Sequence, residues 1–319
     1  MRLCTVFPLV LLAGLSCGKG GGTARRQGAP GASSADAAAA LRGVGSLRLA
    51  RIQAAVVGWP EEGGPPPRQE VLEEKLAGRL TATGLFALAG PGQADGPPSK
   101  LRMEVALGLV GDDRKAPKIR GMLLLQVKIA GASPEEDGTL EENLISEVPM
   151  ARSEQGIAEQ CTAFLSRMLD DAVRGLAAKE KIRLGDRDAV REALGGSDPL
   201  LFRAALSSVA AHGLKELVPN LISLLGSEDP AVRDGAIGAL VEMRERTAVA
   251  ALTGLAKFGD LDTMRRIIDA IGTIGGDEAH SYLEFVAQGH GHPAIRELAQ
   301  KALQHLEDRE KNTGRQAGE

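Results

Sequence analysis

The C-terminal half of the chain repeats with a fixed period of 31 residues. Three segments begin at Asp198-Pro199, Asp229-Pro230 and Asp260-Leu261, and consecutive starting points lie 31 residues apart. A unit of this length holds two short helices and cannot bury its own apolar face, so neighbouring units must stack into a solenoid. The period therefore predicts a binding scaffold.

Each unit has the local pattern of a helix pair. Asp followed by Pro predicts an N-cap and a first helical residue, and a small residue such as Ala236 allows the next helix to approach closely. The second helix of each unit carries apolar residues at matching places. These predicted core positions are Leu217, Leu221 and Leu224, then Ala248, Leu252 and Leu255, then Ala279, Leu283 and Val286.

The residues from Asp229 to Leu240 resemble the first helix of HEAT repeats, particularly the short bacterial type found in phycobilin lyases. The segment from His292 to Leu303 repeats this pattern with one inserted residue. Together the units cover residues 198–308. The resemblance implies an all-α solenoid whose second helices line a concave surface for a protein partner.

Two aromatic residues interrupt the small outward positions of the second helices. Tyr282 takes the place of Asn220 and Ala251, and Phe285 takes the place of Ser223. Aromatic anchors often dominate interface energy, so these five positions are the predicted partner-binding residues. The alternative is that Tyr282 and Phe285 pack under the final helix, between His292 and His305.

Residues 1–16 have the pattern of an export signal. Arg2 precedes an apolar run from Val6 to Leu15, which is shorter than the roughly 20 residues that span a bilayer. The run ends in Gly14-Leu15-Ser16-Cys17, which resembles a bacterial lipobox. The resemblance implies that Cys17 carries acyl chains such as palmitate. Ordinary signal cleavage, which Gly14 and Ser16 also fit, would instead leave a free thiol at Cys17.

Residues 17–44 are predicted to be a lipid-anchored disordered linker. The stretch from Gly18 to Ala40 consists almost entirely of Gly, Ala, Ser, Arg and Gln and has no apolar period. A flexible chain of this length spans about 26 Å. Gly18 after the cysteine resembles an outer-membrane sorting signal. We therefore expect a bacterial envelope protein, anchored by lipid at the periplasmic face of the outer membrane.

Residues 45–182 are predicted to form an α+β mixed-sheet domain. The strand patterns cover 47–57, 101–109, 119–129 with Gly121 interrupting, and 144–148, and the helical patterns cover 69–83 and 157–176. The order is β-α-β-β-β-α, in which two helices cover one sheet face. The phrase from Leu76 to Phe86 resembles the TolB amino-terminal domain and other envelope lipoproteins, which implies an accessory role through protein contacts.

The predicted fold class is therefore multidomain, with an α+β sandwich followed by an all-α HEAT-repeat solenoid. Residues 183–197 are expected to be a linker or capping helix, and residues 309–319 a disordered tail.

Composition argues against several kinds of chemistry. The formal net charge is −4, and residues 198–310 hold 11 Lys and Arg against 17 Asp and Glu, a balance of −6. Nucleic-acid binding needs clustered cations, so no nucleic-acid partner is expected. The sequence has no HExxH or GxSxG pattern. No enzyme activity and no cofactor are expected.

Four other features have ordinary structural interpretations. His280, His290 and His292 extend over about 15 Å of helix, too far for one metal ion. Cys161 lies on an apolar helical stripe, which favours buried packing. The glycine-rich residues 271–276 fall at a predicted turn between helices, and the acidic residues of 135–142 are predicted to form a solvated loop without calcium.

The predicted function is a membrane-anchored scaffold or adaptor that binds a protein partner through its repeats. The alternative is an accessory or lyase-like protein that holds a small molecule or chromophore in the repeat groove. No clustered Cys, His or acid-base pair marks that groove.

Overall fold

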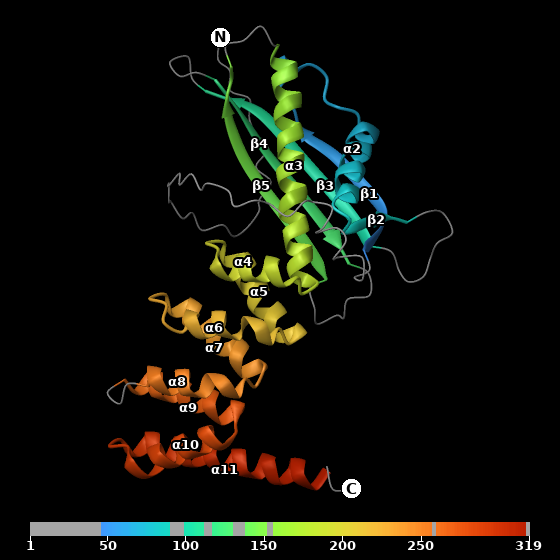
Figure 1. Ribbon diagram of the computed structural model, residues 1–319. Coiled ribbons are helices and arrows are strands. Elements are labelled where there is room, and N and C mark those ends of the chain that lie inside the picture. The colour runs from blue at the N-terminus through green and yellow to red at the C-terminus, as the bar shows by residue number, and fades with distance from the viewer. Residues whose placement is uncertain are drawn as a thin grey trace, which may run out of the picture. The chain divides into compact units, whose positions relative to one another are not determined.

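The computed structural model describes residues 46–89, 99–111, 117–129, 138–151, 156–256 and 260–316. The chain divides into two compact units, residues 1–177 and residues 178–319. We call them the sheet unit and the repeat unit (Figure 1). Cys17, the signal segment 1–16 and the linker 17–44 lie outside the described residues, as do residues 135–137 of the predicted acidic loop.

A five-stranded mixed sheet forms the centre of the sheet unit, with strand order β2-β1-β3-β4-β5. β1 runs parallel to β2 and β3, whereas β3, β4 and β5 are antiparallel neighbours. This confirms the predicted mixed sheet and hairpin. The strands are β1 (Leu47–Gly58), β2 (Phe86–Leu88), β3 (Ser99–Val110), β4 (Lys118–Lys128) and β5 (Thr139–Pro149).

Two differences from the predicted strands have local causes. β2 is an additional strand, and its three residues are too few to show an alternating pattern. β5 begins at Thr139 and includes Glu141 and Glu142, which the sequence analysis had assigned to a loop. The pairing of Leu125 with Glu142 and of Gln126 with Glu141 holds them in the sheet.

Helices α2 (Gln69–Ala82) and α3 (Ile157–Arg183) cover one face of the sheet (Figure 1). Leu72, Leu76 and Leu80 of α2 are almost completely buried, as predicted from their spacing. The Arg79 guanidinium of α2 donates to Asp170 of α3 at 2.6 Å, which joins the two helices. A 3-10 helix, η2 (Glu61–Gly63), precedes α2.

Gly121 interrupts the apolar alternation of β4 because α3 packs directly against it. A Cβ at this position would lie closer than 3 Å to Met168 of α3 and to Leu107 of β3. Both side chains belong to the buried core, so they have little room to move. The glycine therefore sets the distance between α3 and the sheet.

The repeat unit consists of two layers of helices (Figure 1). In the A layer α5, α7, α9 and α11 contact one another in succession, and each B-layer helix packs against the A helix that follows it. The A helices are α5 (Pro199–His212), α7 (Pro230–Glu242), α9 (Leu261–Ile274) and α11 (Pro293–Gln316). The B helices are α6 (Val218–Leu224), α8 (Val249–Leu255) and α10 (Asp277–Gly289), with η3 (Lys215–Leu217) and η4 (Arg246–Ala248) before the first two. Helix α4 (Arg187–Gly195) precedes the first A helix.

The repeat pattern produces the same helix starts in successive units. Asp198, Asp229 and Asp260 are N-caps whose carboxylates accept backbone N–H groups at 2.8, 2.8 and 3.1 Å. The Arg233 guanidinium donates to the carbonyls of residues 227 and 228 at 2.7 and 3.0 Å. Arg296 makes the equivalent contacts to residues 290 and 291. These contacts fix the turn before each of the two helices.

The core of the repeat unit runs without interruption from Ile182 to Leu306. The aligned positions Ala205, Ala236, Ile267 and Ala299 are all no more than 1% exposed, so they are equivalent core positions. Neighbouring repeats therefore bury each other's apolar faces.

The predicted disordered tail, residues 309–319, is wrong over most of its length, because α11 continues to Gln316. Two contacts hold its later turns. The Arg309 guanidinium donates to the Gly272 carbonyl at 3.2 Å, and Lys311 lies 3.6 Å from Glu307 one turn earlier.

Replacing Gly121 with Ala should destabilise the sheet unit by about 1–3 kcal/mol, because the added methyl displaces buried Met168 and Leu107. Trp59 is the one tryptophan of the chain, so its fluorescence during denaturant unfolding reports on this unit. Gly78→Ala is the control. Nothing lies within 4 Å of a Cβ on Gly78 in α2, so this change should stabilise by about 0.5–1 kcal/mol. Equal effects of the two substitutions would contradict the packing role of Gly121.

Candidate functional site

We give the name B face to twelve outward positions of α6, α8 and α10 that align with one another at the 31-residue period. Each of these positions is exposed or half-buried, and each lies opposite the buried residues of its helix. One of the twelve residues is charged. The B face comprises Pro219, Asn220, Ile222, Ser223, Ala250, Ala251, Thr253, Gly254, Ser281, Tyr282, Glu284 and Phe285.

All five predicted partner-binding residues lie on the B face. Asn220 and Ala251 are half-buried, and Ser223 is exposed. The two aromatic residues differ. Phe285 is 60% exposed, so packing under α11 does not account for it. Tyr282 is half-buried and packs against the core of the repeat unit.

The Tyr282 hydroxyl is buried and has no hydrogen-bond partner among the described residues. Burial raises the pKa of this hydroxyl, because the phenolate would lose its solvation. A buried donor without an acceptor costs free energy. The Tyr282 hydroxyl therefore lowers the stability of the fold, whereas Ala251 at the aligned position has no polar side-chain group to bury.

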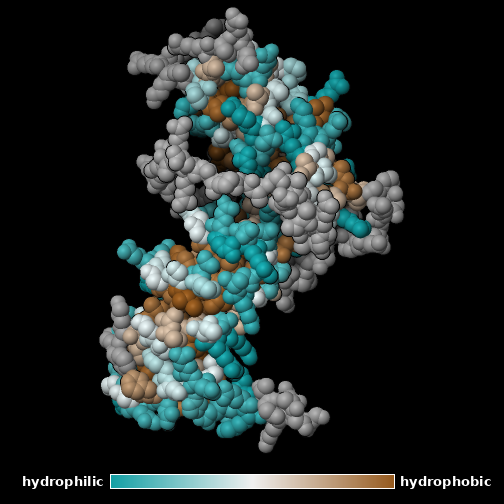
Figure 2. Space-filling model, viewed as in Figure 1, coloured by the Kyte–Doolittle hydropathy of each residue, from teal (hydrophilic) through white to brown (hydrophobic). Residues whose placement is uncertain are grey.

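The A helices present a different surface. Charged side chains occupy many of the exposed positions of α9 and α11, whereas those of α5 are mostly uncharged. Ion pairs join Asp234 of α7 to Arg266 of α9 at 2.8 Å and Glu297 to Lys301 within α11 at 2.7 Å. In Figure 2, apolar residues gather over the first helices of the repeat unit, and α11 is mainly hydrophilic. Charged, ion-paired surfaces are normally solvated. The B face thus carries fewer charges than the exposed positions of α9 and α11.

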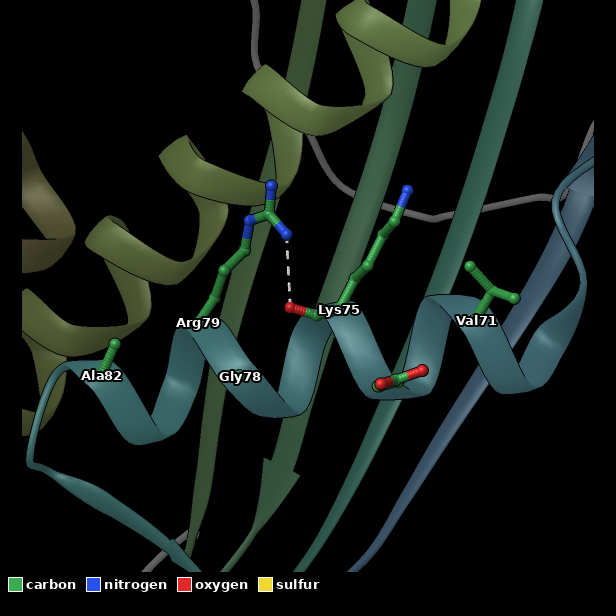
Figure 3. A pocket seen from close by; sticks show the side chains of 6 residues that line it. Val71, Lys75, Gly78, Arg79 and Ala82 are labelled. Carbon is green, nitrogen blue, oxygen red and sulfur yellow. Dashed lines mark hydrogen bonds between the residues drawn. The ribbon is translucent and has the colours of Figure 1, made fainter.

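Helix α2 carries a shallow groove of about 500 Å³, formed where Gly78 has no side chain (Figure 3). All its lining residues belong to this one helix: Val71, Glu74, Lys75, Gly78, Arg79 and Ala82. The Arg79 guanidinium is engaged by the Lys75 carbonyl, Ser166 and Asp170. The groove therefore lacks the converging polar groups of a ligand site.

The second face of the sheet carries a cluster of cations that the sequence analysis missed. Arg51 of β1 pairs in register with Lys100 of β3, and Lys100 pairs with Lys128 of β4. Arg48 lies at the same end of β1. All four are exposed, and no ion pair joins any of them to another described residue. We call Arg48, Arg51, Lys100 and Lys128 the cationic row.

Cys161 and the glycine-rich residues 271–276 have structural roles. Cys161 is a free, fully buried cysteine, as predicted. Burial, with a smaller contribution from the Glu62 carboxylate, raises the pKa of its thiol. Gly275 and Gly276, with φ of 78° and 93°, form the turn between α9 and α10, whereas residues 271–274 of the predicted turn belong to the last turn of α9.

The three histidines make separate local contacts. His280 Nε2 lies 3.5 Å from Glu307 of α11, and His290 Nδ1 accepts the His292 backbone N–H at 3.0 Å. In the described part of the chain, three or more metal-ligating side chains do not come together. Nor does that part contain a helix with the length and apolar character needed to cross a membrane.

Residues 187–266 match the family model of the HEAT repeats. The match begins with α4 and ends within α9, so it covers the three Asp caps and Arg233. No curated protein matches the chain. HEAT repeats commonly mediate protein binding, and proteins that contain them are typically non-catalytic scaffolds.

Alkaline titration should give Tyr282 a pKa above the ordinary tyrosine value of about 10. Tyr282 is the one tyrosine of the chain, so absorbance at 295 nm reports on it alone. Because the folded pKa is the raised one, the folded protein loses stability as pH rises above the unfolded value. Tyr282→Phe, which removes the buried hydroxyl, should preserve or raise the melting temperature. An ordinary pKa together with a less stable Phe variant would contradict the buried, unpaired hydroxyl.

Proposed function

We propose that this protein is a non-catalytic scaffold that binds a protein partner on the B face while a lipid on Cys17 holds it at a bacterial envelope membrane. The observation that carries the proposal is the chemistry of the B face. Eleven of its twelve residues are uncharged, and they end at Phe285, which is 60% exposed on α10. The match of residues 187–266 to HEAT repeats supports a role in protein binding.

The B face suits a protein segment because binding requires little desolvation of charge. Small residues such as Ser223, Ala251 and Gly254 allow a backbone to approach α6 and α8 closely. A large aromatic side chain supplies much of the apolar area that an interface buries. We expect the partner to present an apolar side chain to Phe285 and an uncharged stretch to α6 and α8.

The membrane anchor is supported by the sequence pattern at residues 14–17 and by the linker composition that follows it. A tether of this kind positions the repeats near the envelope without restricting which way they face. We propose the periplasmic face of the outer membrane as its location, on the resemblance of Gly18 to a sorting signal. The proposed role is thus that of an envelope adaptor.

Phe285→Ala should weaken partner binding by about 10-fold to 100-fold, because it removes the predicted anchor. The full-length protein is immobilised, incubated with an envelope extract from the source cells, and the retained proteins are quantified by mass spectrometry. Leu200→Ala is the matched control, since Leu200 on α5 is 59% exposed but lies in the A layer.

The informative partner is one retained by wild type and by Leu200→Ala and depleted on Phe285→Ala. Circular dichroism of all three proteins verifies that the repeats remain folded. If Leu200→Ala loses the partner and Phe285→Ala retains it, the binding surface is in the A layer. If neither change affects retention, the proposed role of the B face is wrong.

A further inference from the structure

The face of the sheet opposite α2 and α3 is strongly basic. We call it the open face, because no described helix of the sheet unit covers it. Its described residues include seven cations and three carboxylates: Arg48, Arg51, Lys100, Arg102, Lys118, Arg120 and Lys128, with Glu104, Glu141 and Glu147. By contrast, α2 and residues 157–177 of α3 carry four cations and six carboxylates. The sheet unit is therefore electrically polarised, with its basic side on the open face.

The charges of the open face separate into a neutralised region and an unneutralised one. Toward one end of the sheet, Glu147 forms ion pairs with both Arg120 and Lys118, and these cations lower the pKa of its carboxyl. At the other end, the cationic row has no carboxylate in its register. Lys128 of β4 pairs with Thr139 of β5, so the row is followed by an uncharged residue.

The cationic row by itself destabilises the fold, because its like charges repel one another. Residues directly opposite each other on neighbouring strands have Cβ atoms about 4.5–5.5 Å apart, and like charges at that distance repel. Lys100 stands between Arg51 on one side and Lys128 on the other. A surface kept in this arrangement at the expense of stability is typical of a site for an anionic partner.

We propose that the cationic row docks the sheet unit onto anionic phospholipid headgroups. This inference rests on the proposed function, because the tether is what brings the face to a membrane. The described chain begins at residue 46, one residue before β1, and β1 carries Arg48 and Arg51. The predicted tether therefore enters the fold at the same end of the sheet as the cationic row.

A lipid surface fits these observations better than a nucleic acid. The cations lie on the face of a sheet, which presents them side by side to an extended anionic surface. The chain as a whole has a formal charge of −4, which opposes long-range attraction to a polyanion in solution. A tether of about 26 Å removes that difficulty, because it holds the face within a few Debye lengths of the membrane.

The test uses the full-length Cys17→Ser protein, so that binding reports on the fold and not on the acyl chains. Vesicles of equal parts phosphatidylglycerol and phosphatidylcholine are compared with pure phosphatidylcholine by flotation at low salt. We expect binding to the anionic vesicles alone, weakening as salt rises. Each cation near an anionic leaflet contributes about fivefold, so Lys100→Gln/Lys128→Gln should reduce partitioning roughly 25-fold.

The matched control is Arg203→Gln/Arg265→Gln, which removes two exposed cations from the A helices and should leave partitioning within about twofold. Because the substitutions relieve repulsion, the melting temperature of Lys100→Gln/Lys128→Gln should be unchanged or higher. If the two lysines instead stabilised the fold, the melting temperature would fall. Absence of vesicle binding, equal losses in the two double variants, or binding to heparin without binding to vesicles would each overturn the proposal.

The anchor is tested separately by mass spectrometry of wild type. Anionic vesicle binding by Cys17→Ser without a lipid on wild-type Cys17 would support the cationic row and refute the anchor. A lipidated wild type whose Cys17→Ser variant ignores anionic vesicles would support the anchor and refute the docking face.

Discussion

The repeat unit depends on one constraint, which is that a 31-residue helix pair cannot bury its own apolar side. Ala236, for example, is completely buried, and the helices that contact α7 are α5, α6 and α9 of its own and neighbouring units. Stacking removes this apolar surface from water, which stabilises the fold by about 25 cal/mol for each Å² buried. Because each repeat contacts only its neighbours, the same contacts recur along the array and leave one side of each B helix uncovered.

The turns between repeats keep the stacked helices in register. A carboxylate N-cap begins α5, α7 and α9, and Arg233 and Arg296 bind the carbonyls that precede α7 and α11. In α9 this arginine position is the buried Met264, so the third unit exchanges polar contacts at its turn for apolar packing. The array therefore tolerates different residues at aligned positions of its repeats. Tyr282 and Phe285 are another example, since they occupy positions that hold smaller residues in the other units.

The sequence was sufficient to predict the period, the caps and the mixed sheet, because each depends on residues close together in the chain. It was insufficient where the outcome depends on pairing between distant segments. The interruption at Gly121 is explained by Met168, 47 positions later in the sequence. Likewise, the cationic row exists only through the register that joins Arg51, Lys100 and Lys128. Spacing placed Tyr282 and Phe285 together, but only the packing of α10 distinguishes the half-buried ring from the exposed one.

The two units thus present different chemistry to their surroundings. The sheet unit has an unneutralised cationic end, and the repeat unit has a B face with one charged residue and an exposed aromatic residue. Both surfaces arise from the same kind of asymmetry, in which one side of a layer is buried and the other remains open. An adaptor held near a membrane would use one surface for position and the other for its partner.

If the repeats are equivalent stacking units, the protein should fold without one of them, and thermal unfolding of a variant that lacks only residues 229–259 tests this most directly. That deletion removes one whole period and places α6 before α9, where Ile267 would occupy the place of Ala236. Far-UV circular dichroism should retain a cooperative transition at a lower temperature, with less helical signal. Loss of any cooperative helical transition would contradict the account, because the remaining repeats would then be unable to stack without the one removed.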